Sequence, residues 1–126
     1  MYVLIIGYNN ISINLIKSFL AEKQVVFLID NKKEEDIQIQ SKFFYYYEVD
    51  ITDMKKVLEK ASRKMLLKIF VVTEDDCLNL MIEEALKNLD NVQVIYTSRS
   101  LKKISCHKEN NSYLQDFLDP LAKVVT

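Results

Sequence analysis

Glycine, proline, cysteine and histidine are all scarce in this sequence of 126 residues. Gly7 is the one glycine and Pro120 the one proline, so asparagine, aspartate and serine must form most turns. The cysteines, Cys77 and Cys106, are too few and too far apart in the sequence for a disulfide framework or a zinc site. The single histidine, His107, lacks the third group that would orient a catalytic base. We therefore predict no metal site and no catalytic set.

A strong net charge and a long apolar run are also lacking. The formal net charge is −1, whereas a nucleic acid partner requires a basic surface. No apolar run approaches the roughly 20 residues of a membrane-spanning helix, and no signal peptide precedes the first apolar run. We expect a cytoplasmic protein without nucleic acid or direct membrane insertion, and its length suits one domain over residues 1–126.

Five apolar runs alternate with segments of helical periodicity. The runs predict strands at residues 2–7, 25–29, 43–49, 68–73 and 92–97. Helices are expected after the first, third and fourth runs, with Thr52 capping the second of these helices and Asp75 or Asp76 the third. Such alternation predicts an α/β fold, a doubly wound Rossmann-like parallel sheet of strand order 3-2-1-4-5 with helices on both faces.

Other segments are less regular. Residues 31–40 are polar, and we expect a short exposed helix there. The aromatic run 43–47 suits a strand with one buried face, whose exposed aromatic side chain could instead form a subunit contact. Towards the C-terminus we expect a loop or frayed helix at 101–111, a short helix at 112–118 and a sixth edge strand at 122–125.

Ligands of open parallel sheets bind beyond the carboxyl ends of the strands, where the strand order reverses. The residues just past those ends are therefore the candidate nucleotide-binding residues. They are Gly7, Tyr8, Asn9, Asn10, Ile11, Asp30, Asn31, Asp50, Ile51, Thr73 and Glu74.

The turn after the first strand resembles a dinucleotide fingerprint, G-x-G-x-x-G, in which Asn9 and Ser12 replace the second and third glycines. Gly7 allows a sharp turn, so the helix behind it could bind a phosphate; alternatively, the turn needs glycine for steric reasons alone. The Asn9 side chain should obstruct a pyrophosphate, whereas Ser12 is small enough for close helix–strand packing.

Two aspartates follow strand ends. Asp30 lies about 20 residues after the turn and can accept both ribose hydroxyls of an adenosine, although it could also be a solvated strand end or a helix cap. It disfavours a 2′-phosphate, which Lys32 and Lys33 nearby would accept. Asp50 could lie near an adenine or could cap with Thr52.

Over residues 1–97 the chain resembles the TrkA-N domain, also called the RCK or KTN domain, the regulator of potassium conductance. The resemblance rests on Gly7, on Asp30, on residues 49–53 in place of the family's G-D-A-T-D, and on a T-x-x-D-x-x-N motif after the fourth strand. That motif is matched by Thr73, Asp76 and Asn79. Asn79 could fasten the loop or meet a ligand. Residues 98–126 diverge from the family pattern.

The resemblance implies regulation rather than catalysis. Domains of this family lie on the cytoplasmic side of potassium channels and uptake systems, bind NAD(H), AMP, ADP or ATP, and pair into dimers or larger rings whose arrangement the nucleotide biases. This chain departs from the family at Val49, in place of the third-strand glycine, and at Tyr96 and Thr97, where an arginine is usual. Two other functions stay open: a degenerate domain that serves dimerisation and assembly, and a small NAD-dependent oxidoreductase.

Overall fold

The computed structural model describes residues 2–63 and 66–101. Five strands, three α-helices and one short 3₁₀ helix follow each other in this part of the chain, and a further helical segment begins at residue 98. They are β1 (Tyr2–Ile6), α1 (Asn10–Ala21), β2 (Val25–Asp30), η1 (Glu34–Asp36), β3 (Phe44–Glu48), α2 (Met54–Ser62), β4 (Leu66–Val71), α3 (Asp76–Leu86) and β5 (Val94–Thr97).

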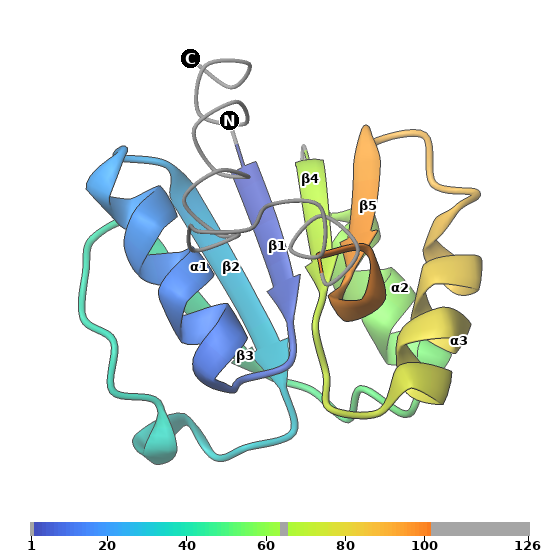
Figure 1. Cartoon of the computed structure of the whole chain (residues 1–126), viewed down its shortest axis with the longest axis horizontal. Coiled ribbons are helices and arrows are strands. Elements are labelled where there is room, and N and C mark those ends of the chain that lie inside the picture. The colour runs from blue at the N-terminus through green and yellow to red at the C-terminus, as the bar shows by residue number, and fades with distance from the viewer. Residues whose placement is uncertain (1, 64–65, 102–126) are drawn as a thin grey trace, which may run out of the picture.

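All five strands form one parallel sheet in the order β3-β2-β1-β4-β5, which confirms the predicted topology. The central strand β1 pairs with β2 on one side and β4 on the other, so that Ile5 lies opposite Leu28 and Phe70. Helix α1 covers one face, while α2 and α3 cover the other (Figure 1). The strand order reverses between β1 and β4. The crevice in which sheets of this kind bind ligands therefore lies between these two strands, at the carboxyl edge of the sheet.

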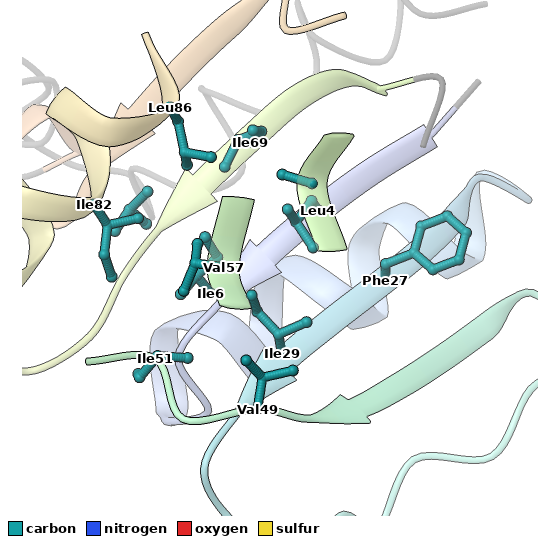
Figure 2. Close-up of a cluster of buried hydrophobic side chains, with 12 residues drawn as sticks. Leu4, Ile6, Phe27, Ile29, Val49, Ile51, Val57, Ile69, Ile82 and Leu86 are labelled. Atoms are coloured by element: carbon teal, nitrogen blue, oxygen red, sulfur yellow. The ribbon is translucent and has the colours of Figure 1, made fainter. Parts of the chain in front are cut away.

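Two cores sandwich the sheet because successive side chains of a strand point to opposite faces. Val3 and Ile5 belong to the core under α1, whereas Leu4 and Ile6 belong to the core under α2 and α3, and all four side chains are buried. Figure 2 shows the second core, with Val57 of α2 packed over β1. This two-faced burial explains why the central strands are continuous apolar runs rather than alternating ones.

The edge strand β3 presents one exposed aromatic side chain, as its sequence predicts. Tyr45 is 48% exposed and stacks on Phe27, with ring centroids 5.3 Å apart. Tyr47 stacks on the same Phe27 ring at 6.1 Å, and the Lys60 ammonium lies over Tyr47. These contacts fasten the edge strand to β2 and α2.

Several predicted boundaries differ from the structure. Asp53, not Thr52, caps α2, because its carboxylate accepts from the backbone N–H groups of Lys55 and Lys56. The polar segment 31–40 does contain a short exposed helix, as expected, which is the 3₁₀ turn Glu34–Asp36, and Ile37 and Ile39 after it pack partly buried against the core under α1. Asp75 is the cap of α3, one of the two residues expected in that role.

The described part of the chain reaches only the beginning of the C-terminal region for which helices and a strand were expected. Residues 98–101 are helical, and Leu101 is buried in the core under α1. The predicted loop or helix at 102–111, the helix at 112–118 and the sixth strand at 122–125 lie outside the described residues.

Candidate functional site

Two neighbouring cavities open at the carboxyl edge, where the order of the strands reverses. The first, called here the Asp30 cavity, has a volume of about 210 Å³. It is lined by Gly7, Tyr8, Asn9, Asp30, Asn31, Lys32, Ile51, Thr73 and Glu74. The second, the Asn10 cavity, measures about 290 Å³. It is lined by Asn9, Asn10, Ile11, Val72, Thr73, Glu74, Asp76 and Ser98. Of the eleven candidate residues, Asp50 alone lines neither cavity.

Gly7, directly after β1, lies against the backbone of Val72 and Thr73, directly after β4. Its φ is +104°, a conformation that side chains with a Cβ rarely adopt. A Cβ at this position would also lie 3.0 Å from both Cα and N of Thr73. The steric explanation for this glycine is therefore sufficient by itself, and the glycine alone is no argument for a phosphate.

Asp30 lies at the end of β2 with 5% of its surface exposed. One carboxylate oxygen accepts from the backbone N–H of Tyr8 at 2.6 Å, and the other from that of Asn31 at 2.6 Å. These two bonds fix the carboxylate at the base of the turn. A carboxylate has about four acceptor positions, so both oxygens retain capacity for a ligand hydroxyl.

The two residues that replace the fingerprint glycines bind each other. The Asn9 side-chain oxygen accepts from the N–H groups of Ile11, at 3.0 Å, and Ser12, at 3.1 Å. In return the Asn9 N–H donates to the Ser12 hydroxyl at 2.7 Å, which completes a capping box. The Asn9 amide also donates to the carbonyl of Val72 at 2.5 Å, across the gap to β4.

This capping box uses donors that a glycine-rich turn would offer to a phosphate. The N–H groups of Gly7, Tyr8, Asn9, Ile11 and Ser12 all donate within the protein. Within residues 2–63 and 66–101, the N–H of Asn10 is the one donor of this turn without a protein partner. Helix α1 therefore presents a single backbone donor to an anion, rather than a ring of them.

Lys32 is the cation among the residues that line the Asp30 cavity; it was not one of the eleven candidate residues, although the sequence had offered it, with Lys33, as a partner for a 2′-phosphate. Its ammonium donates to the Tyr8 carbonyl at 3.3 Å and lies 5.1 Å from the centre of the Tyr8 ring. Its position two residues beyond Asp30 indicated that Lys32 could lie near the site. The sequence alone did not show on which side of the chain the ammonium would lie. The structure turns it back over the glycine turn, where it supplies positive charge.

The third strand end contributes Ile51 rather than Asp50 to the cavity. Ile51 is 5% exposed and lines the Asp30 cavity with apolar surface. Asp50 instead accepts from the N–H and hydroxyl of Thr52, and these hydrogen bonds lower the pKa of its carboxyl below the ordinary value. The sequence left open whether Asp50 lies near an adenine or caps with Thr52. In the structure the Asp50 side chain binds Thr52.

The loop from β4 to α3 is held by Asn79, which is 2% exposed. Its side-chain oxygen accepts from the N–H of Thr73 at 3.0 Å, and its amide donates to the carbonyl of Thr73 at 3.1 Å. The Ser98 hydroxyl donates to the same carbonyl at 3.5 Å. Asn79 therefore fastens the loop that forms the wall of both cavities.

A family model for the TrkA-N domain matches residues 3–111 of the chain. This chain belongs to the TrkA-N domain family. Membership makes it a Rossmann-like regulatory domain associated with potassium transport, in a family that is typically regulatory rather than catalytic. No curated protein matches the chain.

The three residues of the T-x-x-D-x-x-N motif in this TrkA-N domain have two different roles in the structure. Thr73 and Asn79 bind each other and shape the loop, whereas Asp76 begins α3 and lines the Asn10 cavity. Two of the three motif residues thus act on the loop's geometry. The third is a carboxylate in the second cavity.

Metal and catalytic groups were predicted to be absent. Across residues 2–63 and 66–101 of the TrkA-N domain, no three His, Cys, Asp or Glu side chains gather as metal ligands would. Cys77 is exposed in the first turn of α3, and the Cys106–His107 pair lies outside the described residues.

Among residues 2–63 and 66–101, no helix combines the length and hydropathy required to cross a bilayer.

Tyr46 ties the segment after β2 to the edge strand. Its hydroxyl donates to the carbonyl of Asp30 at 3.0 Å and to that of Lys32. Burial, together with the Asp30 and Glu48 carboxylates, raises the pKa of this hydroxyl above its ordinary value, so the protonated, donating form persists further into the alkaline range.

Removing that hydroxyl should loosen the segment that carries Asp30 and Lys32. We expect Tyr46→Phe to lower the free energy of unfolding by about 1 kcal/mol, because two carbonyls lose their donor. Tyr45→Phe is the matched control, since Tyr45 lies on the same strand with its side chain exposed. Urea denaturation measures both; equal stability losses in the two variants would contradict the assignment.

Proposed function

We propose that this TrkA-N domain binds an adenine nucleotide or NAD(H) in the Asp30 cavity, and that occupancy regulates a cytoplasmic assembly with a potassium channel or uptake system. The observation that carries the proposal is the buried Asp30 carboxylate, which is held by two backbone N–H groups at the base of a cavity at the strand-order reversal. That is the position at which doubly wound sheets bind nucleotides.

Four groups that line the two cavities suit the ribose, base and phosphate of a nucleotide. The carboxylate has acceptor capacity for ribose hydroxyls, and Ile51 offers apolar surface to a base. Lys32 and the free N–H of Asn10 supply the attraction for a phosphate, the first from the Asp30 cavity and the second from the neighbouring one. Ribose, base and phosphate thus each have a partner of matching chemistry.

Regulation requires that the ligand prefer one arrangement of the assembly. The loops that line the Asp30 cavity come from β1, β2, β3 and β4, so a ligand there contacts the ends of four strands. We propose that this domain pairs as a homodimer or within a larger ring, and that nucleotide binding stabilises one arrangement over another. The free energy by which the nucleotide shifts this equilibrium equals the difference between its binding free energies to the two arrangements.

Thermal melting tests nucleotide binding directly. A ligand at ten times its dissociation constant should stabilise the folded chain by about 1.4 kcal/mol and raise the melting temperature by several degrees. The purified chain is melted with AMP, ADP, ATP, NAD or NADH at millimolar concentration. Asp30→Ala should abolish the shift, whereas Asp50→Ala, a carboxylate at the neighbouring strand end outside both cavities, should retain it.

An assembly module without nucleotide is the second candidate. It is favoured by the capping box, which satisfies most donors of the turn internally, and by the exposed Tyr45 at the edge of the sheet. Melting curves that no nucleotide shifts, together with an oligomer that persists in dilution, would replace the first proposal by this one. Turnover of a nicotinamide cofactor would instead revive the oxidoreductase.

A further inference from the structure

We propose that Asn9 divides the nucleotide cleft and makes it selective for a nucleoside monophosphate against a dinucleotide. The inference rests on the proposed function and names its ligand class. Asn9, Thr73 and Glu74 line both the Asp30 cavity and the Asn10 cavity, so they form the wall between them. A dinucleotide that spans the strand-order reversal must cross this wall, whereas a mononucleotide in the Asp30 cavity need not.

Hydrogen bonds hold the Asn9 side chain in place, so that the wall is a fixed part of the structure. The Asn9 carboxamide is held at both ends, by the N–H groups of Ile11 and Ser12 and by the carbonyl of Val72 across the gap. Moving it aside would break three hydrogen bonds; a phosphate could accept from the two helix-start N–H groups again, but the carbonyl of Val72 would be left without its donor. Binding a pyrophosphate through this position therefore carries the cost of dismantling the cap.

Cavity size points in the same direction. The compartments measure about 210 and 290 Å³. Pockets for drug-sized ligands typically run from about 300 to 1,000 Å³, so each compartment is small even for one such ligand. A mononucleotide, with base and ribose in one compartment and its phosphate at the rim, matches this scale better than two linked nucleosides.

Charge separates the compartments as well. In the Asp30 cavity Lys32 offsets part of the negative charge of Asp30 and Glu74, whereas Glu74 and Asp76 line the Asn10 cavity with no cation among its lining residues. Both carboxylates are exposed and face any second phosphate or extended polyphosphate that entered the Asn10 cavity. Like charges at this range disfavour the longer ligand, while one phosphate near Lys32 is attracted.

Calorimetric titration of the full chain with AMP and with NADH tests the inference. We expect the natural sequence to bind AMP at least tenfold more tightly than NADH. Asn9→Gly should tighten NADH binding at least tenfold and change AMP binding less than threefold, because it removes the wall while glycine remains an acceptable helix cap. Asn9→Ser, which keeps a capping oxygen but cannot reach Val72, should shift the ratio in the same direction.

The matched control is Asn88→Gly, the same change at an exposed position beyond α3, which should leave both affinities unchanged. If the natural sequence binds AMP and NADH equally, or if neither Asn9 variant moves their ratio by threefold, the inference is wrong while the proposed function stands. If no variant binds either nucleotide, both are wrong.

Discussion

Gly7→Ala should lower the free energy of unfolding by about 3 kcal/mol, a large share of the stability of a domain of this size. Two costs combine. Alanine is strained at a φ of +104°, and its Cβ would meet backbone atoms of Thr73 at 3.0 Å, which cannot rotate away as a side chain could. The contact joins β1 to β4, the pair on which both cavities depend.

Urea denaturation of both proteins gives the comparison, and Asn10→Ala serves as the control. Asn10 is exposed and lies three residues further along the same turn, so its variant should stay within about 0.5 kcal/mol of the natural sequence. A Gly7→Ala protein as stable as the Asn10→Ala protein would mean that β1 and β4 separate easily, and the close approach would not be a constraint on this fold.

The topology could be predicted from the sequence because its signals are local and repeated. Each central strand is a continuous apolar run, and right-handed crossovers leave few ways to arrange parallel strands that alternate with helices. The position of the site followed from the same topology. Ten of the eleven candidate residues line the two cavities.

The details that escaped prediction are choices between neighbouring polar residues. Thr52 and Asp53 are both good helix caps, and the choice depends on Asp50, whose carboxylate binds Thr52 and leaves the cap to Asp53. Likewise, Asn9 and Ser12 look like two lost glycines, although together they form a reciprocal cap. Such pairings depend on side-chain rotamers and on the carbonyl of Val72, which is distant in the sequence.

The pairings also change what the missing glycines mean. Loss of fingerprint glycines is usually taken as simple loss of phosphate binding, because a side chain blocks the approach of the pyrophosphate. Here the replacing residues stabilise the start of α1 and still leave Lys32 in the Asp30 cavity for one phosphate. The turn is thus altered towards a smaller ligand, which is the basis for expecting AMP to bind more tightly than NADH.

Asn79→Leu should cost about 3 kcal/mol in the free energy of unfolding, since the side chain is 2% exposed and satisfies both backbone groups of Thr73. Leucine has similar volume but leaves that N–H without its acceptor and that carbonyl with the longer contact to Ser98 alone, at about 1–3 kcal/mol for each hydrogen bond lost. Asn88→Leu is the control, because Asn88 is exposed just beyond the same helix. Urea denaturation should show a loss for Asn79→Leu and almost none for Asn88→Leu.

Nucleotide binding should fall in parallel with that loss. Thr73 and Glu74 line both cavities, so a loop released by Asn79→Leu no longer holds the wall against which a ligand packs. A direct ligand contact by Asn79 predicts a different pattern, in which Asn79→Ala weakens AMP binding but leaves stability unchanged. Loss of stability and of binding together identifies Asn79 as the residue that positions the loop, and it explains why a family motif would place a buried amide six residues after the threonine it holds.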